Sequence, residues 1–150
     1  MMTDDSISTS ALLQRLFKTS SIARFIKHYG EQMSRVPFNA YINRLCADKD
    51  TVPERVILKS GIERTYGHQL FNGTRKPSRD KVIQLALGFE MDYNEVQDLL
   101  KIARKSTLYP KIERDAVVIF ALKKGLSVVE VQLTLKELDL PLLGKEDKYE

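Results

Sequence analysis

The sequence predicts an all-α protein that folds as a compact helical bundle. Apolar residues recur every three or four positions in one segment after another, which is the spacing of a buried helix face. Three of these segments open with a hydroxyl or carboxyl side chain followed three residues later by glutamate, a pair typical of helix starts. The pairs are Thr51 with Glu54, Asp92 with Glu95 and Ser127 with Glu130. We expect about seven or eight helices, and no segment has a convincing strand pattern.

The composition is that of a small globular chain. Of its 150 residues, 43% are hydrophobic and 29% are charged, which is typical of neither membrane proteins nor disordered chains. The longest apolar run, residues 116–122, is too short to span a bilayer, and the polar, acidic residues 1–10 do not resemble a secretory signal. The single Cys46 rules out an internal disulfide and a cysteine-rich zinc site. We therefore expect a cytoplasmic protein with no membrane partner.

The spacing of apolar residues in segment 1–34 predicts one or two short accessory helices that end near Gly30. Apolar residues lie on one face of each: Leu12, Leu13, Leu16 and Phe17, then Ile22, Phe25, Ile26 and Tyr29. We expect these helices to cover the main core rather than to form an independent functional arm.

Residues 35–104 predict a central domain of five helices. The first begins at Phe38 and ends at the polar turn 48–50. The second opens at the Thr51–Glu54 pair and stops at Gly61, because glycine takes the left-handed conformation that a sharp turn needs. The third spans about 63–72 and ends at Gly73.

The fourth and fifth helices of this domain also have clear starts. Ser78 follows a proline and caps the fourth, and the Asp92–Glu95 pair opens the fifth. The inward-facing residues expected in the five helices are Phe38, Tyr41, Ile42 and Leu45, then Val56 and Ile57, then Ile62, Tyr66 and Leu70, then Val82, Leu85, Ala86 and Phe89, then Val96, Leu99, Leu100 and Ala103.

Residues 105–150 predict a helical hairpin as a C-terminal extension. The run 116–122 has the composition of a buried strand, but the flanking Arg114-Asp115 and Lys123-Lys124-Gly125 favour a buried helix. A last helix opens at the Ser127–Glu130 pair, carries Val128, Val131, Leu135 and Leu138, and ends before Pro141. The charged residues 145–150 are expected to fray. Two interpretations of the hairpin stay open, namely a closed monomeric core and a dimerisation surface.

Residues 51–77 carry a recognisable order: helix, glycine turn, helix, Asn-Gly and a basic segment before proline. This order resembles the Cro/repressor (XRE-type) helix-turn-helix family, and the match extends through Leu85-Ala86 and 92–96. The hairpin after it looks like an extension found in some bacterial members. The resemblance implies a lambda-repressor-like domain that binds double-stranded DNA in a sequence-specific way and reads the major groove with helix 63–72. A transcriptional regulator of the repressor type is the function expected from it.

The resemblance also implies particular contacts. Arg64, Thr65 and Gln69 match residues that read base edges, and His68 lies on the same outer face. The residues expected on the DNA backbone are Thr51, Asn72, Arg75, Lys76 and Lys81. Thr51 could also act only as a helix cap, and Arg79 and Lys81 also fit solvated helix-face charges. The segment from Arg35 to Lys81 has a net charge of +5, which suits DNA but also an ordinary solvated surface.

One position departs from the family pattern. Gly67 stands where the family buries an aliphatic side chain in the recognition helix, at a helix-propensity cost of about 1 kcal/mol relative to alanine. Tyr66 could supply the missing packing, or the helix could be loose or adapted to bind protein.

An enzyme is not expected, because His28 and His68 have no cysteine or acidic partner at ligand spacing and no phosphate-binding glycine loop is present. No cofactor, metal or small-molecule ligand is implied. The main alternative to DNA binding is a protein-protein interaction module or adaptor with the same fold. A homodimer, formed through the C-terminal hairpin, is a possible assembly.

Overall fold

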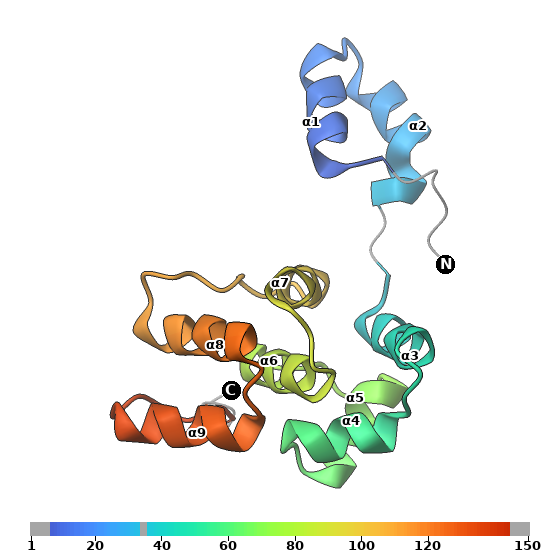
Figure 1. The fold of residues 1–150 in the computed structure, drawn as a ribbon. Helices are drawn as coiled ribbons and strands as arrows, with labels where there is room; N and C mark the ends of the chain where they lie inside the picture. Colours follow the sequence, from blue (N-terminus) through green and yellow to red (C-terminus); the bar gives the residue numbers. More distant parts are fainter. Residues whose placement is uncertain (1–6, 34–35, 145–150) are drawn as a thin grey trace. The chain divides into compact units, whose positions relative to one another are not determined.

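The computed structural model describes residues 7–33 and 36–144, and all regular secondary structure within them is helical (Figure 1). The all-α prediction is therefore confirmed. The chain divides into two compact units, one up to Val36 and one from Pro37 onward. Each unit is described by itself.

The first unit contains helices α1 (Thr9–Lys18) and α2 (Ile22–Met33). The Ser8 hydroxyl caps α1 by accepting a hydrogen bond from the amide of Ala11 at 3.2 Å. Arg15 of α1 donates to the Tyr29 hydroxyl of α2 at 2.7 Å, and the Phe25 ring beside Tyr29 is buried. The predicted end near Gly30 is too early, because α2 continues to Met33. That these helices cover the main core stays a prediction.

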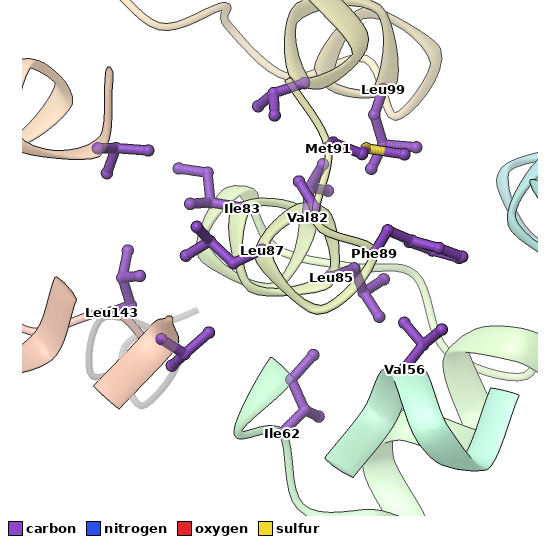
Figure 2. Packing of buried hydrophobic residues seen from close by; sticks show 14 of the residues in the cluster. Val56, Ile62, Val82, Ile83, Leu85, Leu87, Phe89, Met91, Leu99 and Leu143 are labelled. Atoms are coloured by element: carbon purple, nitrogen blue, oxygen red, sulfur yellow. The ribbon is translucent and has the colours of Figure 1, made fainter. Parts of the chain in front are cut away.

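The second unit begins with five helices within the range predicted for the central domain. They are α3 (Phe38–Asp48), α4 (Pro53–Ser60), α5 (Arg64–Asn72), α6 (Arg79–Gly88) and α7 (Tyr93–Ile102). Every residue from Val82 to Phe89 is buried, so α6 is covered on all sides. Figure 2 shows this arrangement: Val56 and Ile62 pack on one side of α6, while Met91 and Leu99 pack on the other. The α6 helix is the central element on which the others pack.

The capping signals predicted for the second unit form, except at the start of α4. The Asp92–Glu95 and Ser127–Glu130 capping boxes are confirmed, and so is the cap from Ser78. The expected Thr51–Glu54 capping box is wrong. Val52, not Thr51, is the N-cap residue of α4, and its apolar side chain cannot cap the helix. The Glu54 carboxylate binds Arg64 and His68 of α5 instead of a backbone amide at the start of α4.

The C-terminal hairpin consists of α8 (Glu113–Lys124) and α9 (Val128–Glu137). Residues 116–122 are helical, as the flanking residues indicated, but the expectation of a buried helix holds for one face only. Val118 and Ala121 are buried, whereas Phe120 is 53% exposed. Leu138, expected inside the last helix, caps its end and is exposed. The predicted fraying of residues 145–150 falls outside the described residues.

The α8–α9 hairpin repeats the α6–α7 hairpin at an interval of 35 residues. Residues that are identical at this interval include Arg79 and Arg114, Asp80 and Asp115, Glu95 and Glu130, Val96 and Val131, Gln97 and Gln132, and Lys101 and Lys136. The backbone repeats as well, since left-handed residues occur at Glu90 and Gly125 and again at Arg104 and Asp139. The chain therefore contains two copies of one helical hairpin.

Equivalent side chains in the two copies make equivalent hydrogen bonds. The amide group of Gln97 bonds to the backbone N–H and C=O of Leu108 at 2.8 and 3.1 Å. The amide group of Gln132 bonds in the same way to Leu143, at 2.8 and 2.9 Å. Each glutamine thus fastens the segment that follows its own hairpin.

Two crossed ion pairs join the copies. Arg79 binds both carboxylate oxygens of Asp115 and the carbonyls of its own copy at Ser106 and Thr107. Arg114 does the same with Asp80, together with the carbonyls of Pro141 and Leu142. Both aspartates are buried. The interpretation of Arg79 as a solvated surface charge is therefore wrong, because its guanidinium is committed to this network.

Candidate nucleic-acid interface

The helices α4 and α5 form a helix–turn–helix unit with a well-fixed turn. Gly61 has φ of 71°, the left-handed value that favours glycine. The buried Ser60 hydroxyl donates to the carbonyl of Ile57 at 2.6 Å and accepts from the amide of Ile62 at 3.2 Å. Glu63 then caps α5 by accepting from the amides of Thr65 and Tyr66, at 3.0 and 2.8 Å. These two backbone N–H bonds lower the pKa of the Glu63 carboxyl.

Gly67 lies at the closest approach of the two helices. A Cβ placed there would lie 2.6 Å from Cγ2 and 2.7 Å from Cγ1 of Ile57. The side chain that takes the space is therefore Ile57 of α4, and not Tyr66 as the sequence suggested. Both Gly67 and Ile57 are buried, so the glycine belongs to a close-packed contact between α4 and α5.

The four residues predicted to read bases lie together on the outer side of α5. Arg64 and Thr65 are exposed, and His68 and Gln69 are partly exposed. The buried residues of the same helix are Gly67, Leu70 and Phe71. The polar outer row is thus backed by an apolar face that packs on the core.

Glu54, in the first turn of α4, connects that helix to the outer side of α5. Its Oε1 accepts from Nε of Arg64 at 2.8 Å, and its Oε2 lies 2.6 Å from Nε2 of His68. These hydrogen bonds, with Arg64 first and His68 second, lower the pKa of the Glu54 carboxyl. The same contact raises the pKa of the Arg64 guanidinium. A shallow hollow beside this cluster is lined by Pro53 and Asn72 among others.

A second cluster lies around the ring of Tyr66, which is partly exposed. The guanidinium carbon of Arg75 lies 4.3 Å from the ring centroid, and Nζ of Lys81 lies 5.1 Å from it. Arg75 also donates through Nε to the side-chain carbonyl of Gln69 at 2.9 Å. Cation–π contacts of this kind hold the two positive groups beside α5.

The other predicted backbone contacts occupy varied surroundings. Asn72 accepts from the amide and hydroxyl of Thr74, at 2.9 and 2.7 Å, and so shapes the turn after α5. Lys76 is exposed. Thr51 precedes the N-cap of α4, and its amide closes the end of α3 by donating to Cys46 at 2.9 Å.

Sequence reasoning missed the roles of Glu54 and Tyr66. Glu54 was assigned to a local cap, yet its partners are ten and fourteen residues away. Tyr66 packs against the core, as its place on the inner stripe of α5 predicts, and its ring also contacts Arg75 and Lys81. Helical spacing predicted which side of α5 faces outward, but no local pattern identifies partners on another helix.

In residues 7–33 and 36–144, no group of three or more His, Cys, Asp or Glu is arranged to hold a metal ion. No helix in that part of the chain has both the length and the apolar character to cross a membrane. Comparisons with protein-family models, with curated proteins and with solved structures found no match.

Proposed function

We propose that the chain binds double-stranded DNA in a sequence-specific way, with α5 in the major groove, and acts as a transcriptional regulator of the repressor type. One observation carries the proposal: an exposed polar row on α5 is backed by an apolar face and flanked by two cations held on Tyr66. An α-helix fits the major groove, and such a row can meet base edges there. The resemblance of residues 51–77 to the Cro/repressor family supports the same function.

The outer row of α5 and the cluster around Tyr66 would make different kinds of contact with DNA. Arg64, Thr65, His68 and Gln69 would contact base edges, whereas Arg75, Lys76 and Lys81 would contact phosphates, together with Thr51 and Asn72. A guanidinium pairs bidentately with guanine, and such a pair gives about 1–3 kcal/mol of discrimination. Phosphate contacts give affinity for any sequence.

This division is tested by selection from random duplexes with the full chain, followed by titrations at several salt concentrations. We expect Arg64→Ala to relax the preference at one base position, by about 1–3 kcal/mol, with little change in the salt dependence. Lys76→Ala, at an exposed residue proposed to contact phosphates, should weaken all duplexes alike and reduce the slope of log affinity against log salt by about one. A wild-type chain that enriches no sequence would overturn the proposal.

A second candidate function is a protein-protein interaction module with the same fold. A hollow bounded by the ends of α4, α6 and α8 and the start of α9 favours it. Leu58, 82% exposed, and Val129, 68% exposed, lie at this hollow. Exposed apolar groups that border a hollow are typical of protein-binding surfaces. Leu58→Ser should leave DNA binding unchanged if α5 carries the function, and should abolish partner binding if the hollow does.

The proposal includes no catalytic step and no cofactor. The buried, free thiol of Cys46 suits a reducing compartment, so we place the activity in the cytoplasm. A homodimer through the C-terminal hairpin would present two copies of α5 to two half-sites. However, the crossed ion pairs use the starts of α6 and α8 within one chain, so a dimer would have to form on other faces of the hairpin. Sedimentation equilibrium of the wild-type chain measures this directly.

A further inference from the structure

We propose that Glu54 is a positioning residue for base recognition, which holds Arg64 and His68 so that each presents one defined edge to the groove. This role presupposes the DNA binding proposed above. It differs from that proposal in assigning the specificity of α5 to a residue on α4.

The Glu54 carboxylate binds two of the residues that are proposed to contact bases. Oε1 binds Nε of Arg64 at 2.8 Å, and Oε2 binds Nε2 of His68 at 2.6 Å. Glu54 itself stands in the first turn of α4, two residues before Val56, whose buried side chain packs beside α6 (Figure 2). The carboxylate is therefore carried by a rigid element, whereas the two side chains that it holds are long or rotatable.

The contact leaves Arg64 suited to guanine. Nε is occupied by Glu54, and within the described residues no contact engages the two terminal nitrogens. The side chain is 76% exposed, so this end is accessible to a partner. The two terminal N–H groups match the O6 and N7 acceptors of guanine. Because the side chain is ordered before DNA arrives, binding loses less rotamer entropy.

The contact also sets the hydrogen-bonding state of His68. An ionised carboxylate only accepts hydrogen bonds, so Nε2 of His68 must carry the hydrogen that it donates to Glu54. In the neutral ring Nδ1 is then an acceptor. An acceptor at this position favours bases that present an amino group in the major groove, which are adenine and cytosine.

Glu54 has a second, opposite effect through its charge. A carboxylate on the DNA-facing surface repels phosphates and weakens binding to every sequence. If Glu54 positions the two readers, removing its charge should strengthen non-specific binding and weaken discrimination at the same time. If Glu54 only stabilised the fold, its removal would damage α5. Affinity for unrelated DNA and discrimination between bases would then both fall.

The test compares the wild-type chain with Glu54→Gln on the selected duplex, on its single-base variants and on unrelated DNA. We expect affinity for unrelated DNA to rise about two- to five-fold, and discrimination at the position read by Arg64 to fall about three- to ten-fold. Glu137→Gln is the matched control, because it removes the same charge from the exposed end of α9, and it should leave discrimination unchanged. Thermal unfolding checks that both variants remain folded.

A DNA-free measurement accompanies the titrations. Nitrogen-15 NMR of the His68 ring should show the Nε2–H form in the wild-type chain and a mixture of the two tautomers in Glu54→Gln. A single, unchanged tautomer in the variant would overturn the positioning role, and so would unchanged discrimination. If the wild-type chain reads no sequence, the proposed function fails first, and the role of Glu54 in recognition fails with it.

Discussion

Asp80→Ala is expected to destabilise the second unit by about 3–5 kcal/mol, because it leaves the Arg114 guanidinium without its carboxylate in a largely dry site. Asp80 is 0% exposed and accepts from both terminal nitrogens of Arg114, at 2.8 and 2.5 Å, and from the amide of Gly144 at 2.8 Å. Most of the expected loss comes from keeping the Arg114 guanidinium in a buried site after this carboxylate is removed, and not from the attraction of the pair itself. Urea unfolding measures the change in the free energy of unfolding.

The repeat supplies the matched comparison for this variant. Asp115 is the equivalent residue, with Arg79 and the amide of Tyr109 in the equivalent places. Asp115→Ala should therefore cost a similar amount. The double variant Asp80→Leu with Arg114→Met removes both charges and should lose much less than Asp80→Ala alone. A loss below about 1 kcal/mol for either aspartate variant would show that the crossed pairs do not hold the two hairpins together.

Gly67→Val is expected to destabilise the chain by about 3 kcal/mol, because the new side chain would occupy the space of Ile57. Even the Cβ alone would lie 2.6 Å from Cγ2 of Ile57. Ile57 is buried within the core, so it has little room to retreat. This clash outweighs the gain of up to about 1 kcal/mol that a helix obtains when glycine is replaced.

A double-mutant cycle separates this contact from other effects. Ile57→Ala alone should cost about 2–5 kcal/mol, because it opens a cavity against Gly67. The two substitutions together should be less harmful than the sum of their separate effects, by about 1–3 kcal/mol, since the valine fills the space that the isoleucine left. Chemical unfolding of the four proteins gives the coupling energy. Strict additivity would mean that Ile57 is not the reason for glycine at this position.

Local signals in the sequence accounted for most helix ends. The Asp92–Glu95 and Ser127–Glu130 boxes, the Ser78 cap and the glycine turns at Gly61 and Gly73 all form as expected. Each of these features depends on side chains and amides within one turn of helix, so residue spacing is sufficient to predict them. The Thr51–Glu54 pair has the same spacing and fails, because Glu54 binds the side chains of Arg64 and His68 on α5.

The 35-residue repeat is also visible in the sequence. The Arg-Asp pairs at 79–80 and 114–115, together with Gln97 and Gln132, are its clearest traces. The buried apolar positions repeat as well, since Val118, Ala121, Val131 and Leu135 match the buried Ile83, Ala86, Val96 and Leu100. Leu85 is an exception, because it is fully buried while the equivalent Phe120 is half exposed. The two hairpins share one buried face, and α6 differs from α8 in being covered on its other sides as well.

The sequence by itself determined the helical class, most helix boundaries and the outer row Arg64, Thr65, His68 and Gln69, since helical periodicity depends only on the order of residues along the chain. Only the tertiary structure decided the partners of these side chains. Glu54 binds Arg64 and His68, Ile57 fills the space beside Gly67, and Arg79 and Asp115 meet 36 residues apart. Such pairs depend on how helices pack, and the pairing of charges across a packed interface has no period along the sequence.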